Sequence, residues 1–187
     1  MLMKLTALSI ACLYLATSWA IAGFIINPYR HIVAGGVSTS YANTGGSGDR
    51  SGSITITESD SLILISEGQL IDGVTGSGTA FFNGYPAYIN DGSWFAFDFG
   101  ASRLVDEAKF YQQNTTSHGT WKIQGSDDAA AWSDIGSSFT LGGAAEQTIT
   151  AINGNTTAYR HLRFYLITGP SSNVPYLYEI EFKISAP

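Results

Sequence analysis

Residues Trp121 to Trp132 read WKIQGSDDAAAW and carry the clearest structural signal in the chain. The first residues of this stretch alternate apolar with polar side chains, as expected of a strand with one buried face. Gly125 ends this strand, and Asp127 and Asp128 follow in a polar turn, where carboxylates accept hydrogen bonds from backbone amides. We therefore expect a core strand, a sharp turn and a second tryptophan that packs on the scaffold.

The rest of the chain carries short β-rich runs separated by Gly, Ser, Asn and Asp, and it shows no long helical period after residue 23. Within the run at 94–99, Phe95, Phe97 and Phe99 share the face that should fill the core. Short strands at this spacing predict an all-β fold, an antiparallel β-sandwich. The expected strands cover residues 53–57, 61–66, 94–99, 108–112, 120–125, 147–152, 160–168 and 178–184.

The composition excludes several classes of function. Only 13% of the 187 residues are charged, the net charge is −6, and no basic cluster is present. Nucleic-acid binding needs a positive stripe that neutralises phosphates, so no nucleic-acid partner is expected. The single cysteine, Cys12, lies in the apolar N-terminal run, which leaves the body of the protein without a disulfide or a cysteine-based metal site.

The N-terminal third has two parts. Residues 1–22 combine a short basic start, an apolar run and a small-x-small end, which is the form of a secretory signal. The alternative is a retained apolar segment buried against another protein. Residues 23–53 become rich in Gly, Ser, Thr and Asn, and this composition favours an extended arm or linker before a sandwich over residues 54–187.

Four segments in order resemble the discoidin or coagulation-factor C-type family of galactose-binding-like jelly rolls. They read LIDG at 70–73, WFAFDFG at 94–100, WKIQGSDDAAAW at 121–132, and YRHLRF at 159–164 followed by YEIEF at 178–182. The stretch at 74–92 is longer and richer in glycine than the family pattern, and the disulfide of many animal members is absent. The resemblance implies a jelly roll that binds ligands through loops at one end.

Members of this family mostly bind glycans, and sometimes lipids or proteins. A sugar site combines an aromatic platform with a few fixed polar groups. The loops at 81–90, 114–119 and 169–176 carry such residues, and His118 is expected to be an exposed polar contact. The alternative is that the aromatic side chains pack under the loops and the polar ones are only solvated. The candidate ligand-binding residues are Phe82, Tyr85, Tyr88, Asn114, His118, Asn173 and Tyr176.

The resemblance also implies a possible structural Ca²⁺, because many members hold one near the Asp-Gly turn with a glutamate of the last strand. The matching residues are Asp72 and Glu179, and carboxylates are ligands that calcium prefers. The alternative is that Asp72 caps its own turn and Glu179 lies on the surface. No other cofactor is expected.

No enzyme activity is expected. The sequence has no Gly-x-Ser-x-Gly motif, no phosphate-binding loop and no cysteine nucleophile in its body. Asp127 and Asp128 are adjacent in a turn, and successive residues rarely converge on one substrate atom. The motif NPYRH at 27–31 is similar to openings of bacteriophage structural and tail-appendage proteins.

The sequence therefore predicts a non-catalytic carbohydrate-binding or adhesion module, displayed in multiple copies at an extracellular or virion surface. Surface glycans are the expected partners of the sandwich, and other virion or surface proteins are the expected partners of the arm. The alternative is a phage virion structural protein, such as a decoration, head-fibre or tail component, whose sandwich mainly makes protein contacts.

Overall fold

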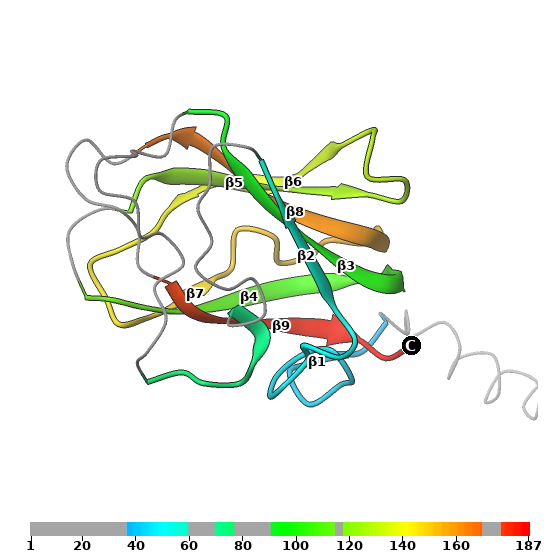
Figure 1. Cartoon of the computed structure of the whole chain (residues 1–187). Coiled ribbons are helices and arrows are strands. Elements are labelled where there is room, and N and C mark those ends of the chain that lie inside the picture. The colour runs from blue at the N-terminus through cyan, green and yellow to red at the C-terminus, as the bar shows by residue number, and fades with distance from the viewer. Residues whose placement is uncertain (1–36, 60–69, 77–90, 115–117, 170–176) are drawn as a thin grey trace, which may run out of the picture. The chain divides into compact units, whose positions relative to one another are not determined.

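The computed structural model describes residues 37–59, 70–76, 91–114, 118–169 and 177–187. Within these ranges the chain forms strands and no long helix (Figure 1). The strands are β1 (Thr39–Ser40), β2 (Thr55–Glu58), β3 (Trp94–Arg103), β4 (Val105–Gln112), β5 (Thr120–Ser126), β6 (Ser133–Thr140), β7 (Glu146–Ile149), β8 (Tyr159–Thr168) and β9 (Leu177–Ser185).

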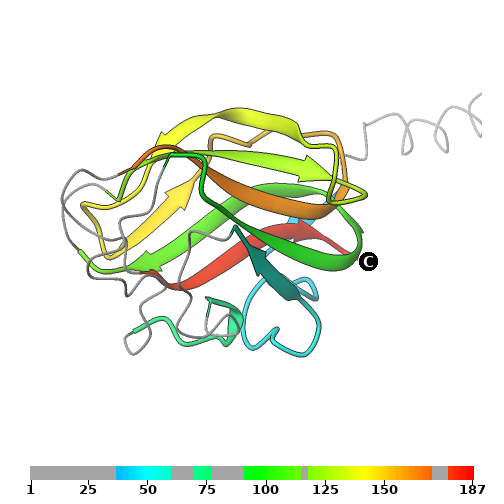
Figure 2. The same cartoon turned by 45° about the horizontal axis from the view of Figure 1, so that its top comes forward.

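The strands build two antiparallel sheets that face each other. One sheet has the order β1-β9-β4-β7, and the other has the order β2-β3-β8-β5-β6. The turned view shows the two sheets as separate layers (Figure 2). The predicted all-β antiparallel sandwich is confirmed. None of the helices in the described ranges is long and apolar enough to cross a membrane.

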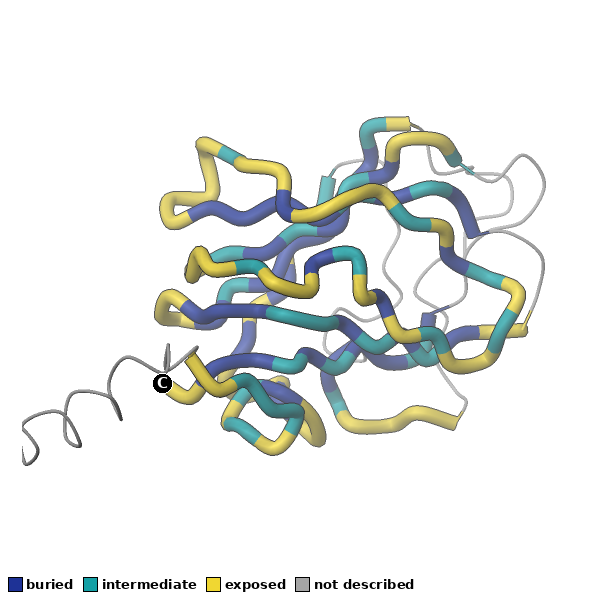
Figure 3. The backbone as a smooth tube through the Cα atoms, turned by 180° about the vertical axis from the view of Figure 1, so that it is seen from behind, coloured by how far each residue is buried: buried dark blue, intermediate teal, exposed yellow. Residues whose placement is uncertain are grey.

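The core between the sheets is dominated by aromatic rings. Phe95, Phe97, Phe164 and Phe182 are fully buried. The centroids of neighbouring rings among them lie 5.0–6.3 Å apart. Trp121 joins them at 5.6 Å from Phe95. Edge-to-face pairs at these distances add to the free energy of burying the rings. Buried and more exposed residues alternate along the strands, as period-two patterning predicts (Figure 3).

The strands with a clean apolar alternation lie where the sequence predicts them, although β4 begins at Val105 and not at residue 108. Strand β6 was not predicted. It is an edge strand with one fully buried residue, Ile135, so its sequence carries almost no alternating pattern. The expected strand at 61–66 lies outside the described residues.

The stretch 121–132 forms the strand and the polar turn that the sequence predicts. The Trp121 side chain is in the core, and the Asp128 carboxylate accepts hydrogen bonds from the backbone amides of Ala130 and Ala131, at 2.9 and 2.8 Å. The second tryptophan, Trp132, also packs on the scaffold and is partly buried. Its ring lies on the outer face of the five-stranded sheet, with the Arg163 guanidinium 4.2 Å from the ring centroid.

The sandwich begins earlier than the sequence-based boundary at residue 54. The unit that contains the sandwich starts at Ser38. Strand β1 pairs with the end of β9, with Thr39 opposite Ser185. Residues 38–53 therefore belong to the same compact unit as the sandwich and are not a linker before it.

Candidate functional site

The residues that flank the three candidate loops lie at the same end of the sandwich. The first residue of β5, Thr120, pairs with the last residue of β8, Thr168, and the first residue of β9, Leu177, pairs with the last residue of β4, Gln112. The backbone amide of Gly169 donates to the Asp91 carboxylate at 2.7 Å. Strand pairing thus brings the ends of all three loops together, as a binding site built from loops requires.

The structure describes two of the seven predicted ligand-binding residues. Asn114 is exposed just beyond the end of β4. The other described residue, His118, is treated next. The remaining predictions lie outside the described residues; they are Phe82, Tyr85, Tyr88, Asn173 and Tyr176.

The expectation that His118 is exposed is wrong, because its side chain is fully buried. The Nδ1 atom lies 3.0 Å from Oε1 of Gln112, and the backbone oxygen of His118 accepts a hydrogen bond from the indole of Trp121 at 2.9 Å. Gln112 in turn donates to Gln147 at 3.0 Å. The Ser-His-Gly sequence suggested a solvated turn, whereas the ring belongs to a polar network beneath the loop end.

Burial lowers the pKa of His118 to about 4, because the charged imidazolium would lose its hydration. The ring is therefore neutral at physiological pH and can donate through one nitrogen only. A neutral ring with its Nδ1 proton directed at Gln112 fits the contact that the structure shows. His118 positions the chain between β4 and β5 and is not a surface contact.

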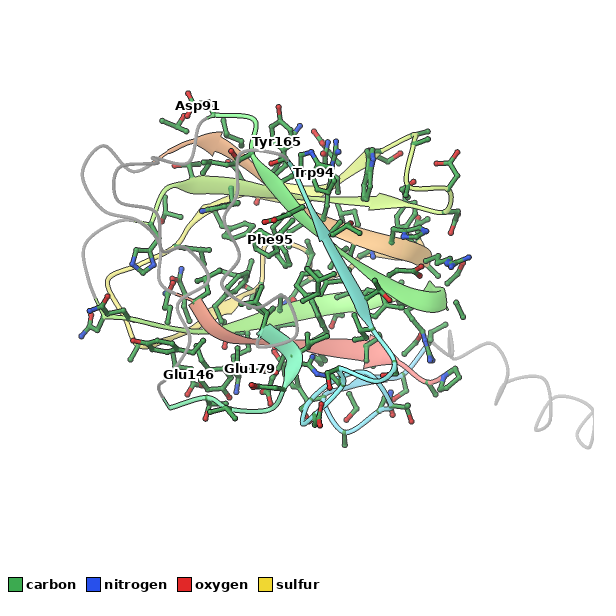
Figure 4. The ribbon with its side chains drawn as sticks, in the orientation of Figure 1. Asp91, Trp94, Phe95, Glu146, Tyr165 and Glu179 are labelled. Atoms are coloured by element: carbon green, nitrogen blue, oxygen red, sulfur yellow. The ribbon has the colours of Figure 1, made fainter. Side chains whose placement is uncertain are left out.

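The predicted calcium residues have different surroundings. Asp72 accepts a hydrogen bond from the amide of Val74 at 2.9 Å, so it caps its own turn. Glu179 is fully buried, although the sequence alternatives were a calcium ligand or a surface residue. One carboxylate oxygen of Glu179 pairs with the Arg50 guanidinium, and the other accepts the amide of Gly73 at 3.1 Å. Figure 4 shows Glu179 on the outer side of β9.

The Arg50 guanidinium occupies the place beside Glu179 where a metal cation would have to bind. Besides Glu179, it donates to the backbone oxygens of Gly46, Gly48 and Ile180, at 3.0, 3.0 and 2.7 Å. Burial raises the pKa of Glu179 and lowers that of Arg50, while each charge opposes the effect on the other. Each group therefore depends on its partner to remain charged.

The residues around Glu179 do not fit a calcium ion. Calcium needs six to eight oxygen ligands, and here the carboxylate and three carbonyl oxygens already accept hydrogen bonds from one arginine. No group of three or more His, Cys, Asp or Glu side chains suited to a metal occurs in the described ranges. The sequence alone could not identify Arg50 as the partner of Glu179, because the two residues are 129 positions apart in the chain.

A second group of solvent-facing side chains lies on the outer face of the five-stranded sheet. Trp94 stands opposite Tyr165, and Lys122 stands opposite Tyr165 from the other side. Arg163 lies two residues before Tyr165, with Trp132 against its guanidinium. Figure 4 shows Trp94 and Tyr165 side by side, with Phe95 pointing the other way. The sequence alone could not show that these side chains meet, because they come from separate strands.

No protein-family model matches the sequence, and no curated protein is similar to it at a significant level. Solved structures do match the fold. A Clostridium perfringens CBM32 module in complex with GalNAc-β-1,3-galactose has a TM-score of 0.56 and 14% identity, over 73% of this chain and 99% of that chain. The family 32 carbohydrate-binding module of NanJ from C. perfringens, in complex with galactose, has a TM-score of 0.55 and 12% identity, over 73% and 97%.

A third module, CBM32 of AlyQ in complex with 4,5-unsaturated mannuronic acid, has a TM-score of 0.51 and 21% identity, over 68% of this chain and 92% of that chain. At these identities the matches establish the fold alone. The chain has the galactose-binding-like jelly roll of CBM32 modules, the architecture that the four sequence segments implied.

Proposed function

We propose that this chain is a non-catalytic carbohydrate-binding module that contacts surface glycans through the loop end of its sandwich. The observation that carries the proposal is the match of its jelly roll to nearly the full length of solved modules in complex with sugars. The convergence of the loop flanks at one end supports it, because concave sugar sites form where several loops meet.

The proposed contacts are the loop residues that the sequence analysis selected, without His118. Aromatic side chains supply flat apolar surfaces for the C–H faces of a sugar ring, and amides fix its hydroxyl groups. The contacts are Phe82, Tyr85, Tyr88, Asn114, Asn173 and Tyr176.

The module acts at an extracellular or virion surface and is displayed in several copies. Few charged residues and modest polar contacts suit weak individual binding, and multivalent display raises the effective affinity without new contacts. Residues 1–22 either direct export or remain as an apolar segment. Residues 23–37, which precede the sandwich, bind a protein partner.

A glycan array probed with the multimerised full chain tests this function. We expect binding to at least one glycan class, and we expect Tyr85→Ala and Tyr176→Ala to weaken it at least tenfold while the thermal midpoint stays unchanged. Tyr41→Ala is the control, because Tyr41 follows β1 at the opposite end of the sandwich. Equal binding by both loop variants and wild type would refute these contacts.

A further inference from the structure

Arg163 is a partly exposed cation without a carboxylate partner. Within the described ranges, five of the Lys and Arg side chains form ion pairs, namely Arg50, Lys109, Lys122, Arg160 and Lys183. Arg103 forms none, but it is buried and donates to the backbone oxygen of Ser185 at 3.4 Å. Arg163 has no described carboxylate within 4.0 Å, in a chain whose net charge is −6.

The nearby negative charges are already matched. Asp134 pairs with Lys122 at 3.0 Å and accepts the amide of Gln124. Asp98 forms a two-point contact with Arg160, with both N–O distances at 2.8 Å, and this contact lowers the pKa of Asp98 to about 2. Arg163 is therefore the described cation of this face that has no ion pair of its own, and Asp134 attracts it only from beyond 4.0 Å.

The guanidinium of Arg163 is held in one orientation. Its Nε atom donates to Oε1 of Gln124 at 2.7 Å, and Gln124 is itself fixed by Asp134. The Trp132 ring covers one side of the guanidinium at 4.2 Å. No described residue accepts a hydrogen bond from Nη1 or Nη2. These two nitrogens form the fork that binds a carboxylate at two points.

Aromatic rings surround this fork. The centroids of Tyr165 and Trp94 lie 5.4 and 5.7 Å from Arg163 Cζ, and all three aromatic side chains are partly exposed. Lys122 lies over Tyr165 at 5.1 Å, and its charge is paired with Asp134. Rings of this kind offer flat surfaces to the C–H groups of a pyranose, while an isolated anion would gain nothing from them.

We propose that Arg163, Trp94, Trp132 and Tyr165 form a second binding site, for a saccharide that carries a carboxylate. The Nη fork takes the carboxylate of the sugar, and the sugar ring packs against Trp94 or Tyr165. This site lies on the outer face of β3, β5 and β8, and it uses none of the loop residues of the proposed function. The two sites can therefore succeed or fail separately.

Binding of a hexamer of galacturonic acid to the full chain, measured by calorimetry, tests this proposal, with a neutral galactose oligomer of equal length as the reference. We expect the acidic oligomer to bind and to shift the indole N–H signals of Trp94 and Trp132. Arg163→Met should weaken this binding at least tenfold. Arg160→Met is the matched control, because it removes a charge from the same strand but leaves the fork and rings in place.

Two further variants keep the test decisive. Arg163→Lys retains the charge and loses the fork, so it should bind at least threefold more weakly than wild type. Trp132→Ala removes a ring outside the core and should weaken binding without lowering the thermal midpoint by more than a few degrees. Equal loss in Arg160→Met and Arg163→Met, or no shift at either indole, would overturn the site. Binding of neutral glycans should survive Arg163→Met, which separates this result from the loop-end function.

Discussion

At the scale of single residues, two buried polar side chains determine how this jelly roll differs from its sequence-based description. Glu179 pairs with Arg50, and His118 hydrogen-bonds Gln112. For both residues, the sequence pattern predicted either a ligand-binding role or exposure at the surface. Neither partner could be identified from local sequence, because burial and pairing of these groups are set by contacts between distant strands.

Replacing Arg50 by alanine should strongly destabilise the fold. The change leaves the buried Glu179 carboxylate without its cation, and such a loss costs about 3–5 kcal/mol. Arg160→Ala is the matched control, because its pair with Asp98 is exposed and should contribute at most about 1 kcal/mol. Urea denaturation measures both variants, and a similar small loss in each would contradict the role given to Arg50.

Calcium should not stabilise the wild-type protein, because Arg50 already occupies the oxygen ligands around Glu179. The thermal midpoint is expected to stay the same in calcium chloride and in a chelator. Differential scanning calorimetry provides the comparison. A midpoint several degrees higher in calcium would show that an ion binds the fold after all.

His118 should make stability depend on pH. Its pKa is lowered to about 4 in the folded state, while an unfolded histidine titrates near 6.5. The stability it contributes is therefore complete above pH 6.5 and is lost as the pH falls toward 4, by up to about 3 kcal/mol. His118→Asn keeps an N–H donor near the Nδ1 position but cannot titrate. Urea unfolding at pH 7 and pH 5 should show a smaller pH effect in this variant, and an equal effect would exclude His118 as the source.

At the scale of elements, the strands with an alternating apolar pattern were predictable, whereas the edge strands β1 and β6 were not. The burial of Phe95, Phe97 and Phe99 follows directly from their spacing. Strand β6 was missed because one buried residue gives no period, and β1 was missed because it is two residues long. The Arg163 cluster was missed for a third reason, since its members meet only through strand register.

Gly125 provides a test of strand packing within residues 121–132. A methyl group at this position would clash with the ring of Tyr159. Gly125→Ala should therefore lower the free energy of unfolding by about 1–3 kcal/mol. Tyr159→Ser in the same chain should remove part of that added cost, so the two changes should not be additive in urea denaturation. Full additivity would mean that the clash is not the cause.

At the scale of the whole molecule, we propose ligand binding at two distinct surfaces of the sandwich. One is the loop end, and the other is the outer face of the five-stranded sheet, which carries an arginine without an ion pair among aromatic rings. The jelly roll itself was predictable from four short segments in order, but a fold of this kind fixes only where loops gather. The ligand depends on the side chains that the loops and the sheet face present.

Sugar binding at the loop end can be measured by an amide chemical-shift titration of the isotope-labelled chain with the strongest array glycan. We expect saturable shifts at the loop flanks, Asp91, Asn114 and Gly169. No shifts are expected at the opposite end, at Gly100 in the irregular part of β3 after Asp98, or at Ala129 in the turn after β5. Absence of saturable shifts at millimolar glycan, or shifts confined to that opposite end, would contradict sugar binding at the loop end.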